Sequence, residues 1–179
     1  KRDRSFAARF VGKHGRIRGT MYGKRCDKTA RSVASGDLYQ SVGEIGIPRE
    51  IAETLTVCET FRRYNRAKQI DRLRCNSVDF VALENGELYN TRFKNRDAYV
   101  PSSGAIFERH IETGDPVVWN RQPTLHKPSI QGARARRVRH PMSQKTRRTL
   151  AINQCLTVAT NADFDGDEIN LHLAVGPDA

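Results

Sequence analysis

The stretch NADFDGDEINLHL, residues 161–173, combines an acidic turn with a strand pattern. Its aspartates, Asp163, Asp165 and Asp167, are two residues apart, so in a helix they would point to different sides. In a flat strand, at about 3.3 Å per residue, the outer pair would lie roughly 13 Å apart. Only a tight turn brings the three carboxylates together, and Gly166 supplies the backbone freedom for it. The last five residues alternate apolar and polar, so we expect the turn to link two strands.

Three clustered carboxylates repel one another unless a cation lies among them. Ligation by a few oxygen atoms suits Mg²⁺, which keeps positions for water and substrate phosphates. An EF-hand loop is excluded, because counting from Asp163 puts Glu168 at position 6 and Ala174 at position 12, where glycine and glutamate are required. A bare Asp-x-Asp-Gly-Asp turn is also compatible with an ordinary solvated turn or a casual cation site.

The composition indicates a polyanionic partner. The chain of 179 residues has 37% hydrophobic residues, 28% charged residues and a net charge of +11. Residues 1–31 hold eleven Lys/Arg against two acids, and residues 131–149 hold seven Lys/Arg and no acid. One such block is often only a solvated face, but two blocks in a chain that also carries an acidic turn favour a nucleic acid brought to a metal.

The remaining composition excludes several classes of protein. The cysteines (Cys26, Cys58, Cys75 and Cys155) are far apart, so we expect reduced thiols, no zinc site and no disulfide framework. No apolar run approaches the length of a membrane span, so no membrane partner is expected. The chain begins at Lys1 without methionine and ends without a closing element, so we expect a piece of a longer chain.

Periodicity gives a coarse map of the elements. Residues 13–31 contain glycine too often for a helix, and we expect short extended segments with basic side chains on one face. Residues 47–76 are predicted to be helical, with Pro48 in a first turn and a second helix after Asn65. Residues 78–93 read as a hairpin around Asn85-Gly86.

Further strands are predicted over residues 105–111, 116–119, 129–140 and 148–160. Pro123 prevents a central strand, so Arg121 and Gln122 are expected at a strand end, with side chains that reach outward. Arginine is always charged and suits phosphate or ribose oxygens.

Three separated strings, in this order, carry a resemblance to a known family. They are GRIRGTMYGKRCDKTAR at 15–31, NRQPTLHK at 120–127 and NADFDGD at 161–167. Together they resemble the largest subunit of the multisubunit DNA-directed RNA polymerases. The resemblance implies a mainly β fold with inserted helices, the double-psi β-barrel of the active-site domain.

The resemblance also implies a division of the chain. Residues 1–37 would form a basic template-contacting segment with the first barrel strands, and residues 38–104 a helical and hairpin insertion. Residues 105–179 would supply the main barrel strands with the catalytic metal loop.

Roles follow from the resemblance, residue by residue. Asp163, Asp165 and Asp167 would hold the catalytic Mg²⁺, and a second Mg²⁺ would arrive with the nucleoside triphosphate. The other implied sites are substrate-binding Arg121, Gln122, Pro123 and Asn161, and nucleic-acid-binding Lys24, Arg25 and Arg31. His126 is expected to be a structural hydrogen-bonding residue.

The implied partners are the DNA template, the RNA–DNA hybrid, nucleoside triphosphates, the second-largest polymerase subunit and smaller subunits. The expected location is the nucleus, or the cytoplasm or virion for a polymerase of a large DNA virus. Alone, the chain is expected to bind nucleic acid weakly and to polymerise nothing.

Pro128 and the segments 76–104 and 131–149 depart from the family pattern, so the polymerase class stays open. Two alternatives also stay open. One is an RNA-dependent RNA polymerase of the double-psi barrel type, and the other is a non-catalytic nucleic-acid-binding module with a structural cation site.

Overall fold

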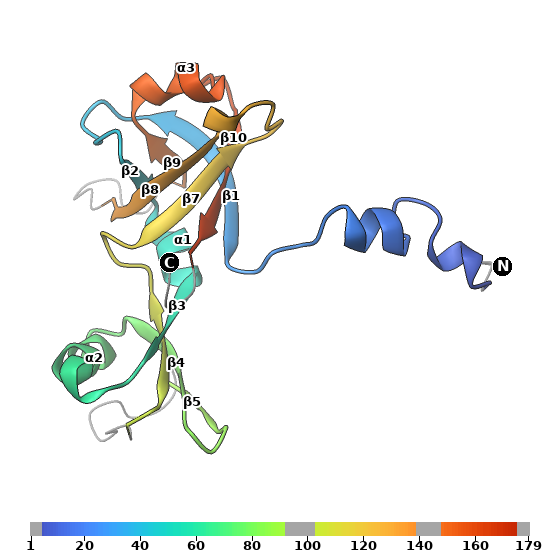
Figure 1. The fold of residues 1–179 in the computed structure, drawn as a ribbon. Coiled ribbons are helices and arrows are strands. Elements are labelled where there is room, and N and C mark those ends of the chain that lie inside the picture. Colours follow the sequence, from blue (N-terminus) through green and yellow to red (C-terminus); the bar gives the residue numbers. More distant parts are fainter. Residues whose placement is uncertain (1–4, 92–102, 139–147, 175–179) are drawn as a thin grey trace.

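The computed structural model describes residues 5–91, 103–138 and 148–174. Two sheets lie one above the other in Figure 1, a closed six-stranded barrel and a four-stranded sheet, and an arm of residues 5–26 projects to one side. Most of the regular structure is strand, which confirms the predicted mainly β fold with inserted helices.

The barrel closes in the order β1-β10-β7-β8-β2-β9. Strand β1 runs antiparallel to β10 and parallel to β9, while β2 runs parallel to β8 and antiparallel to β9. Closure leaves no unpaired sheet edge. The strands are β1 (Thr29–Gly36), β2 (Glu44–Ile47), β7 (Pro116–Arg121), β8 (Ile130–Arg137), β9 (Leu150–Ile152) and β10 (Glu168–Leu173).

Alternation along the strands fills the barrel. In β10 the residues Ile169, Leu171 and Leu173 point inward and are buried, while their neighbours are at least partly exposed. Trp119 of β7, opposite Leu171, is the largest fully buried side chain. Helix α1 (Arg49–Thr54) lies below the barrel in Figure 1 and adds Ala52 to the same core.

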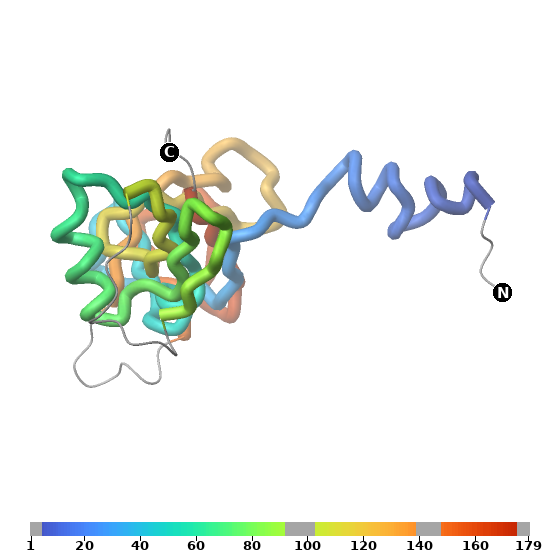
Figure 2. Tube along the Cα trace, turned by 90° about the horizontal axis from the view of Figure 1, so that it is seen from below, coloured from blue at the N-terminus to red at the C-terminus, as the bar shows by residue number. Residues whose placement is uncertain are grey.

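The second sheet has the order β3-β6-β4-β5. Helix α2 (Arg66–Arg74) follows a 3-10 turn, Arg63–Asn65, and lies beside this sheet in Figures 1 and 2. Phe61 and Phe107 stack in its core with ring centroids 5.4 Å apart. The strands are β3 (Thr56–Thr60), β4 (Val78–Ala82), β5 (Leu88–Asn90) and β6 (Ile106–His110).

A partly buried charge network joins α2 to the turn that leads back into the barrel. Arg72 donates both Nε and Nη2 to the carboxylate of Glu112, at 2.6 and 2.7 Å, and Nη1 to Glu59 at 2.7 Å. Arg109 bridges Glu59, at 2.9 Å, to both carboxylate oxygens of Asp115, at 2.7 and 2.9 Å. Bidentate pairs of this kind fix geometry as well as charge.

The structure corrects the prediction for the arm. Residues 13–31 were expected to be extended, but Ile17–Met21 form a short π-helical segment after a 3-10 turn at Ala7–Arg9. Gly15 is buried inside this coil, where a Cβ would lie 2.3 Å from the carbonyl oxygen of Phe10. Glycine there permits close coiling instead of preventing it. The arm extends away from both sheets in Figure 2.

Other predictions are confirmed in part. The helix after Asn65 and the hairpin over 78–93 are present, although only residues up to 91 of the hairpin are described. The predicted helical span 47–76 also contains strand β3, which includes Val57. In the predicted strand 148–160, only Leu150–Ile152 is a strand; a 3-10 turn, Gln154–Leu156, and helix α3 (Thr157–Thr160) follow it.

The segment boundaries differ from the sheets. Strand β2, within the predicted insertion 38–104, belongs to the barrel, whereas β6, within the predicted barrel segment 105–179, belongs to the four-stranded sheet. Within the described residues, no helix is long and apolar enough to cross a membrane.

Candidate functional site

The acidic turn joins helix α3 to strand β10, not two strands as the sequence suggested. Asn161 ends α3 in the left-handed conformation, with φ 50°, which asparagine tolerates better than most residues. The Ala162 N–H donates to the Thr157 carbonyl and completes the helix end. Gly166, with φ 119°, then turns the chain into β10.

The turn is attached to strand β1 at two points. The Ala34 N–H donates to the carbonyl oxygen of Asp167 at 2.8 Å. The ring of Phe164 lies against Gly36, where a Cβ would come within 2.9 Å of Phe164 Cε2. Because Phe164 stands between two of the aspartates, this contact helps to set where their carboxylates lie.

Asp167 is the aspartate most engaged with the protein. Its Oδ2 accepts from Arg121 Nε at 2.8 Å and from the backbone N–H of Asp163 at 2.9 Å. The hydrogen bond from Arg121, with that from the Asp163 backbone, holds the pKa of the Asp167 carboxyl below its ordinary value. Asp163 accepts from the Phe164 N–H at 2.8 Å, and Asp163 and Asp165 are exposed to solvent.

The donor chemistry of the turn fits Mg²⁺, since three carboxylates lie within five residues on an exposed turn. Among the residues that the structure describes, no three such side chains are gathered closely enough to hold a metal. Asp167 faces Arg121 instead. The carboxylates therefore supply the right ligands, and metal binding requires the Asp167 side chain to share or exchange its present partner.

The proposed substrate-binding residues lie around the same end of the barrel. Arg121 is the last residue of β7 and is paired in register with Ile169 at the start of β10, as the strand-end prediction required. Gln122 and Pro123 follow it, exposed and joined by a cis peptide bond, and Asn161 is exposed at the end of α3. His126 Nε2 lies 3.1 Å from the Ala159 carbonyl and ties this loop to α3.

The proposed nucleic-acid-binding residues divide into two groups. Arg31 of β1 donates to Glu168 at 2.6 Å and so lies next to the acidic turn. Lys24 and Arg25 are exposed and precede β1, whose first residue, Thr29, pairs with His172 near the far end of β10. The structure thus brings Arg31 and Arg121 to the turn and leaves Lys24 and Arg25 at the opposite end of β1.

Three residues of the site were missed from the sequence. Gly36 and Phe164 form the packing contact, and Glu168 holds Arg31. The local signal for Gly36 is a glycine at the end of a strand. The local signal for Phe164 is an apolar residue between two acids in an exposed turn. No local signal links them, because their contact joins distant parts of the chain.

A double-psi β-barrel with a carboxylate-bearing turn at one end defines the class of domain. The family model described as RNA polymerase Rpb1, domain 2, matches residues 23–179, and the chain belongs to this family. It is 37% identical over 177 residues to the DNA-directed RNA polymerase II subunits RPB1-A and RPB1-B of Trypanosoma brucei brucei, covering 97% of this chain and 10% of each relative.

The chain is also similar to a subunit of a different polymerase. It is 37% identical over 179 residues to the DNA-directed RNA polymerase III subunit RPC1 of Saccharomyces cerevisiae, covering 95% of this chain and 12% of the relative. The chain therefore spans about a tenth of the length of the curated relatives it matches.

Proposed function

We propose that this chain carries the catalytic turn of a DNA-directed RNA polymerase, and that the assembled enzyme extends RNA on a DNA template. Membership of the family and the names of the relatives support the polymerase. The observation that carries the catalytic role is the turn of Asp163, Asp165 and Asp167, attached to β1 and flanked by Arg31 and Arg121.

The proposed reaction is nucleotidyl transfer. The 3′-hydroxyl oxygen of the RNA forms a bond to the α-phosphorus of a nucleoside triphosphate, while the bond from that phosphorus to the bridging oxygen breaks and pyrophosphate leaves. The hydroxyl proton is released. Mg²⁺ at the three aspartates, with a second Mg²⁺ that arrives with the triphosphate, would lower the pKa of the attacking hydroxyl and stabilise the leaving pyrophosphate.

The remaining residues would position the reactants. Arg121 and Asn161 would donate hydrogen bonds to the ribose hydroxyls, a contact that distinguishes RNA precursors from DNA precursors. Gln122 and Pro123, exposed beside Arg121, would border the incoming base pair. Lys24, Arg25 and Arg31 would neutralise backbone phosphates of the template or hybrid, contacts that carry no sequence information.

The proposed partners are the template, the RNA–DNA hybrid, the second-largest subunit and smaller polymerase subunits. The proposed location is the nucleus, with the cytoplasm or virion as the alternative for a viral enzyme. The chain would be active only inside the full assembly, because it corresponds to about a tenth of each relative.

The test is nucleotide addition on an RNA–DNA scaffold by the parent enzyme carrying Asp165→Asn. The change removes one carboxylate charge and nearly keeps shape. We expect extension to fall more than about 100-fold, since even outer-shell partners of a metal ligand contribute 10- to 100-fold. Scaffold binding should persist.

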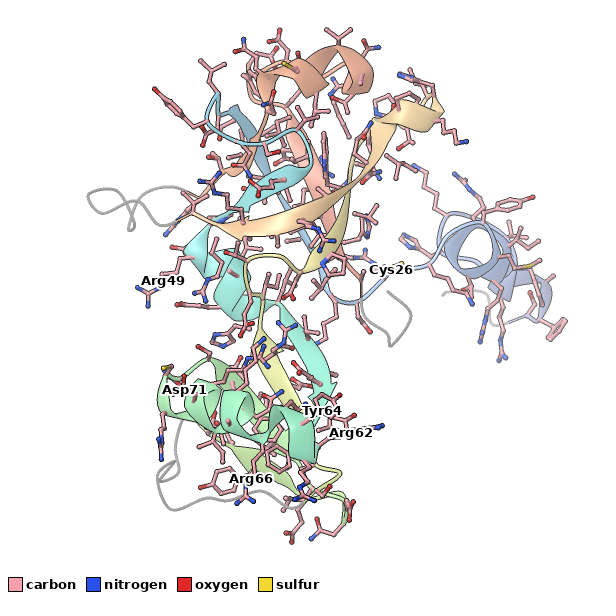
Figure 3. All side chains as sticks on the ribbon, turned by 60° about the vertical axis from the view of Figure 1, so that its left-hand side comes forward. Cys26, Arg49, Arg62, Tyr64, Arg66 and Asp71 are labelled. Atoms are coloured by element: carbon pink, nitrogen blue, oxygen red, sulfur yellow. The ribbon has the colours of Figure 1, made fainter. Side chains whose placement is uncertain are left out.

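Asp71→Asn is the matched control. Asp71 is an exposed aspartate on α2, remote from the turn, as Figure 3 shows. It should extend RNA like the wild type. Unchanged extension by Asp165→Asn would contradict the catalytic role and favour a nucleic-acid-binding module with a structural cation site.

A further inference from the structure

Two consecutive acids at the start of β10 are each held by an arginine from a flanking strand. Arg31 of β1 holds Glu168, and Arg121 of β7 holds Asp167. The two ion pairs differ in their surroundings. The side chains of Arg121 and Asp167 are each only 22% exposed, whereas those of Arg31 and Glu168 are 58% and 46% exposed. Only the Arg121 pair involves one of the three aspartates.

The Asp167 oxygen that Arg121 holds is already saturated with donors. Oδ2 receives the Arg121 Nε–H at 2.8 Å and the Asp163 N–H at 2.9 Å. A guanidinium cannot lose its charge in a protein, so this partner remains a cation at every accessible pH. A divalent ion at the turn would bind the same carboxylate, whose Oδ2 already accepts from two donors, so the ion and Arg121 compete for its charge.

We propose that Arg121 is a resident counter-ion of the turn, which occupies Asp167 before metal binds and is displaced from it when metal binds. This inference rests on the proposed function, in which the three aspartates hold Mg²⁺. Arg121 neutralises Asp167, one of three carboxylates in the turn. It therefore competes with a metal ion for this carboxylate and weakens metal binding.

Displacement has a second consequence, since the freed guanidinium keeps all its N–H donors. Arg121 lies at the strand end beside Gln122 and Pro123, which are exposed. Once released from Asp167, it is available to ribose or phosphate oxygens of a nucleotide. Metal binding would release Arg121 for the nucleotide, and nucleotide binding would hold Arg121 away from Asp167. Metal and nucleotide would therefore each favour binding of the other. Arg121 is in this sense a positioning residue for metal loading.

The test measures metal occupancy directly. Fe²⁺ replaces Mg²⁺ in the purified polymerase assembly, and added hydrogen peroxide, reduced by the bound Fe²⁺, gives hydroxyl radicals that cut the polypeptide near the ion. Mg²⁺ competes with Fe²⁺ for the site and so suppresses cleavage at residues 161–168. The dependence of cleavage on Mg²⁺ concentration gives an apparent Mg²⁺ affinity without a measurement of catalysis. The wild type is compared with Arg121→Gln, without nucleotide.

We expect Arg121→Gln to bind Mg²⁺ about two- to five-fold more tightly, the range for losing a partly exposed ion pair. Arg121→Lys, which keeps the charge, should stay close to the wild type and guards against a variant that fails to assemble. Arg49→Gln, which removes a 2.6 Å pair with Glu53 on α1, is the control for a general loss of charge and should leave the affinity unchanged.

The outcomes separate the two proposals. Unchanged or weaker Mg²⁺ binding in Arg121→Gln overturns the counter-ion role while the metal site stands. Wild-type enzyme with no cleavage at the turn, or with cleavage that survives Asp165→Asn, overturns the proposed function itself.

Discussion

Gly36 shows how one hydrogen atom in place of a side chain affects the acidic turn. Phe164 carries the turn's apolar group, and its ring rests on the Gly36 backbone at the end of β1. The ring is 36% exposed, so it has room to move outward. A methyl group at position 36 would therefore push the ring, and the neighbouring aspartates, without disturbing the barrel core.

Gly36→Ala is expected to reduce nucleotide addition by the assembled enzyme about 10-fold or more, since small displacements of reacting groups cost up to about 100-fold. Stability should change little. Gly132→Ala is the matched control, because Gly132 lies in barrel strand β8 and a Cβ there would have no other atom within 4 Å. Equal activities of the two variants in single-nucleotide extension would show that the Phe164 contact does not position the turn.

The sequence predicted the composition of the site better than its contacts. The three aspartates on a turn and Arg121 at a strand end follow from local spacing and from Pro123. The pairing of Arg121 with Asp167 joins residues 46 positions apart, and that of Arg31 with Glu168 joins residues 137 positions apart. Such pairs depend on strand order, which periodicity does not supply.

At the scale of elements, the charge network fixes α2 to the turn between β6 and β7. Burial raises the pKa of Glu59 and Glu112. Hydrogen bonds from Arg109 and Arg72 outweigh this effect at Glu59, and hydrogen bonds from Arg72 outweigh it at Glu112. The pKa of each carboxyl therefore lies below its ordinary value of 4.5. A carboxyl with a lowered pKa in the folded state contributes stability above its unfolded pKa, and loses it as pH falls through the folded pKa.

Arg72→Met should lower the free energy of unfolding of the chain by about 2 kcal/mol at pH 7. This loss is smaller than for a fully buried ion pair, because both glutamates are about a third exposed. The difference from wild type should shrink in urea unfolding at pH 3.5, below the ordinary glutamate pKa. Arg74→Met, an exposed arginine of the same helix, is the control. A loss that is equal at both pH values would exclude the network as its cause.

Element types were mispredicted where strand pairing or helix capping overrides residue preference. Val57 reads as part of a helical face, yet Thr56–Thr60 pairs with β6 and becomes a strand. Residues 157–160 form helix α3 although β-branched residues favour strands, because Asn153 caps the preceding 3-10 turn and Asn161 ends the helix. The barrel strands with clean alternation, such as β10, were predicted correctly.

At the scale of the whole molecule, candidate phosphate-binding residues lie at both ends of strand β1. Arg31 lies beside the acidic turn, and Lys24 and Arg25 stand where the arm leaves β1. A polyanion that contacts both groups would have to run along the barrel. Each phosphate contact releases counterions, so affinity should depend on salt.

The double variant Lys24→Gln/Arg25→Gln should weaken scaffold binding by the assembled enzyme and reduce the slope of log affinity against log salt by about 1.4 to 1.8 for two lost contacts. Fluorescence anisotropy across a salt series measures both. Arg62→Gln/Arg66→Gln removes the same charge beside α2, far from the barrel in Figure 3, and should leave the slope unchanged. An identical slope in all three proteins would show that Lys24 and Arg25 do not contact phosphate.

The chain enters and leaves the four-stranded sheet at neighbouring residues, since Thr56 and His110 are direct partners in register. The described residues between them, including α2 and most of the four-stranded sheet, are joined to the rest of the chain by these two strand ends and by the ion pairs of Arg72 with Glu112 and of Arg109 with Asp115. All the strand pairings that close the barrel are made by residues outside this segment. This position is therefore a place where a reporter domain can be grafted while the barrel strands and the aspartates are left unchanged.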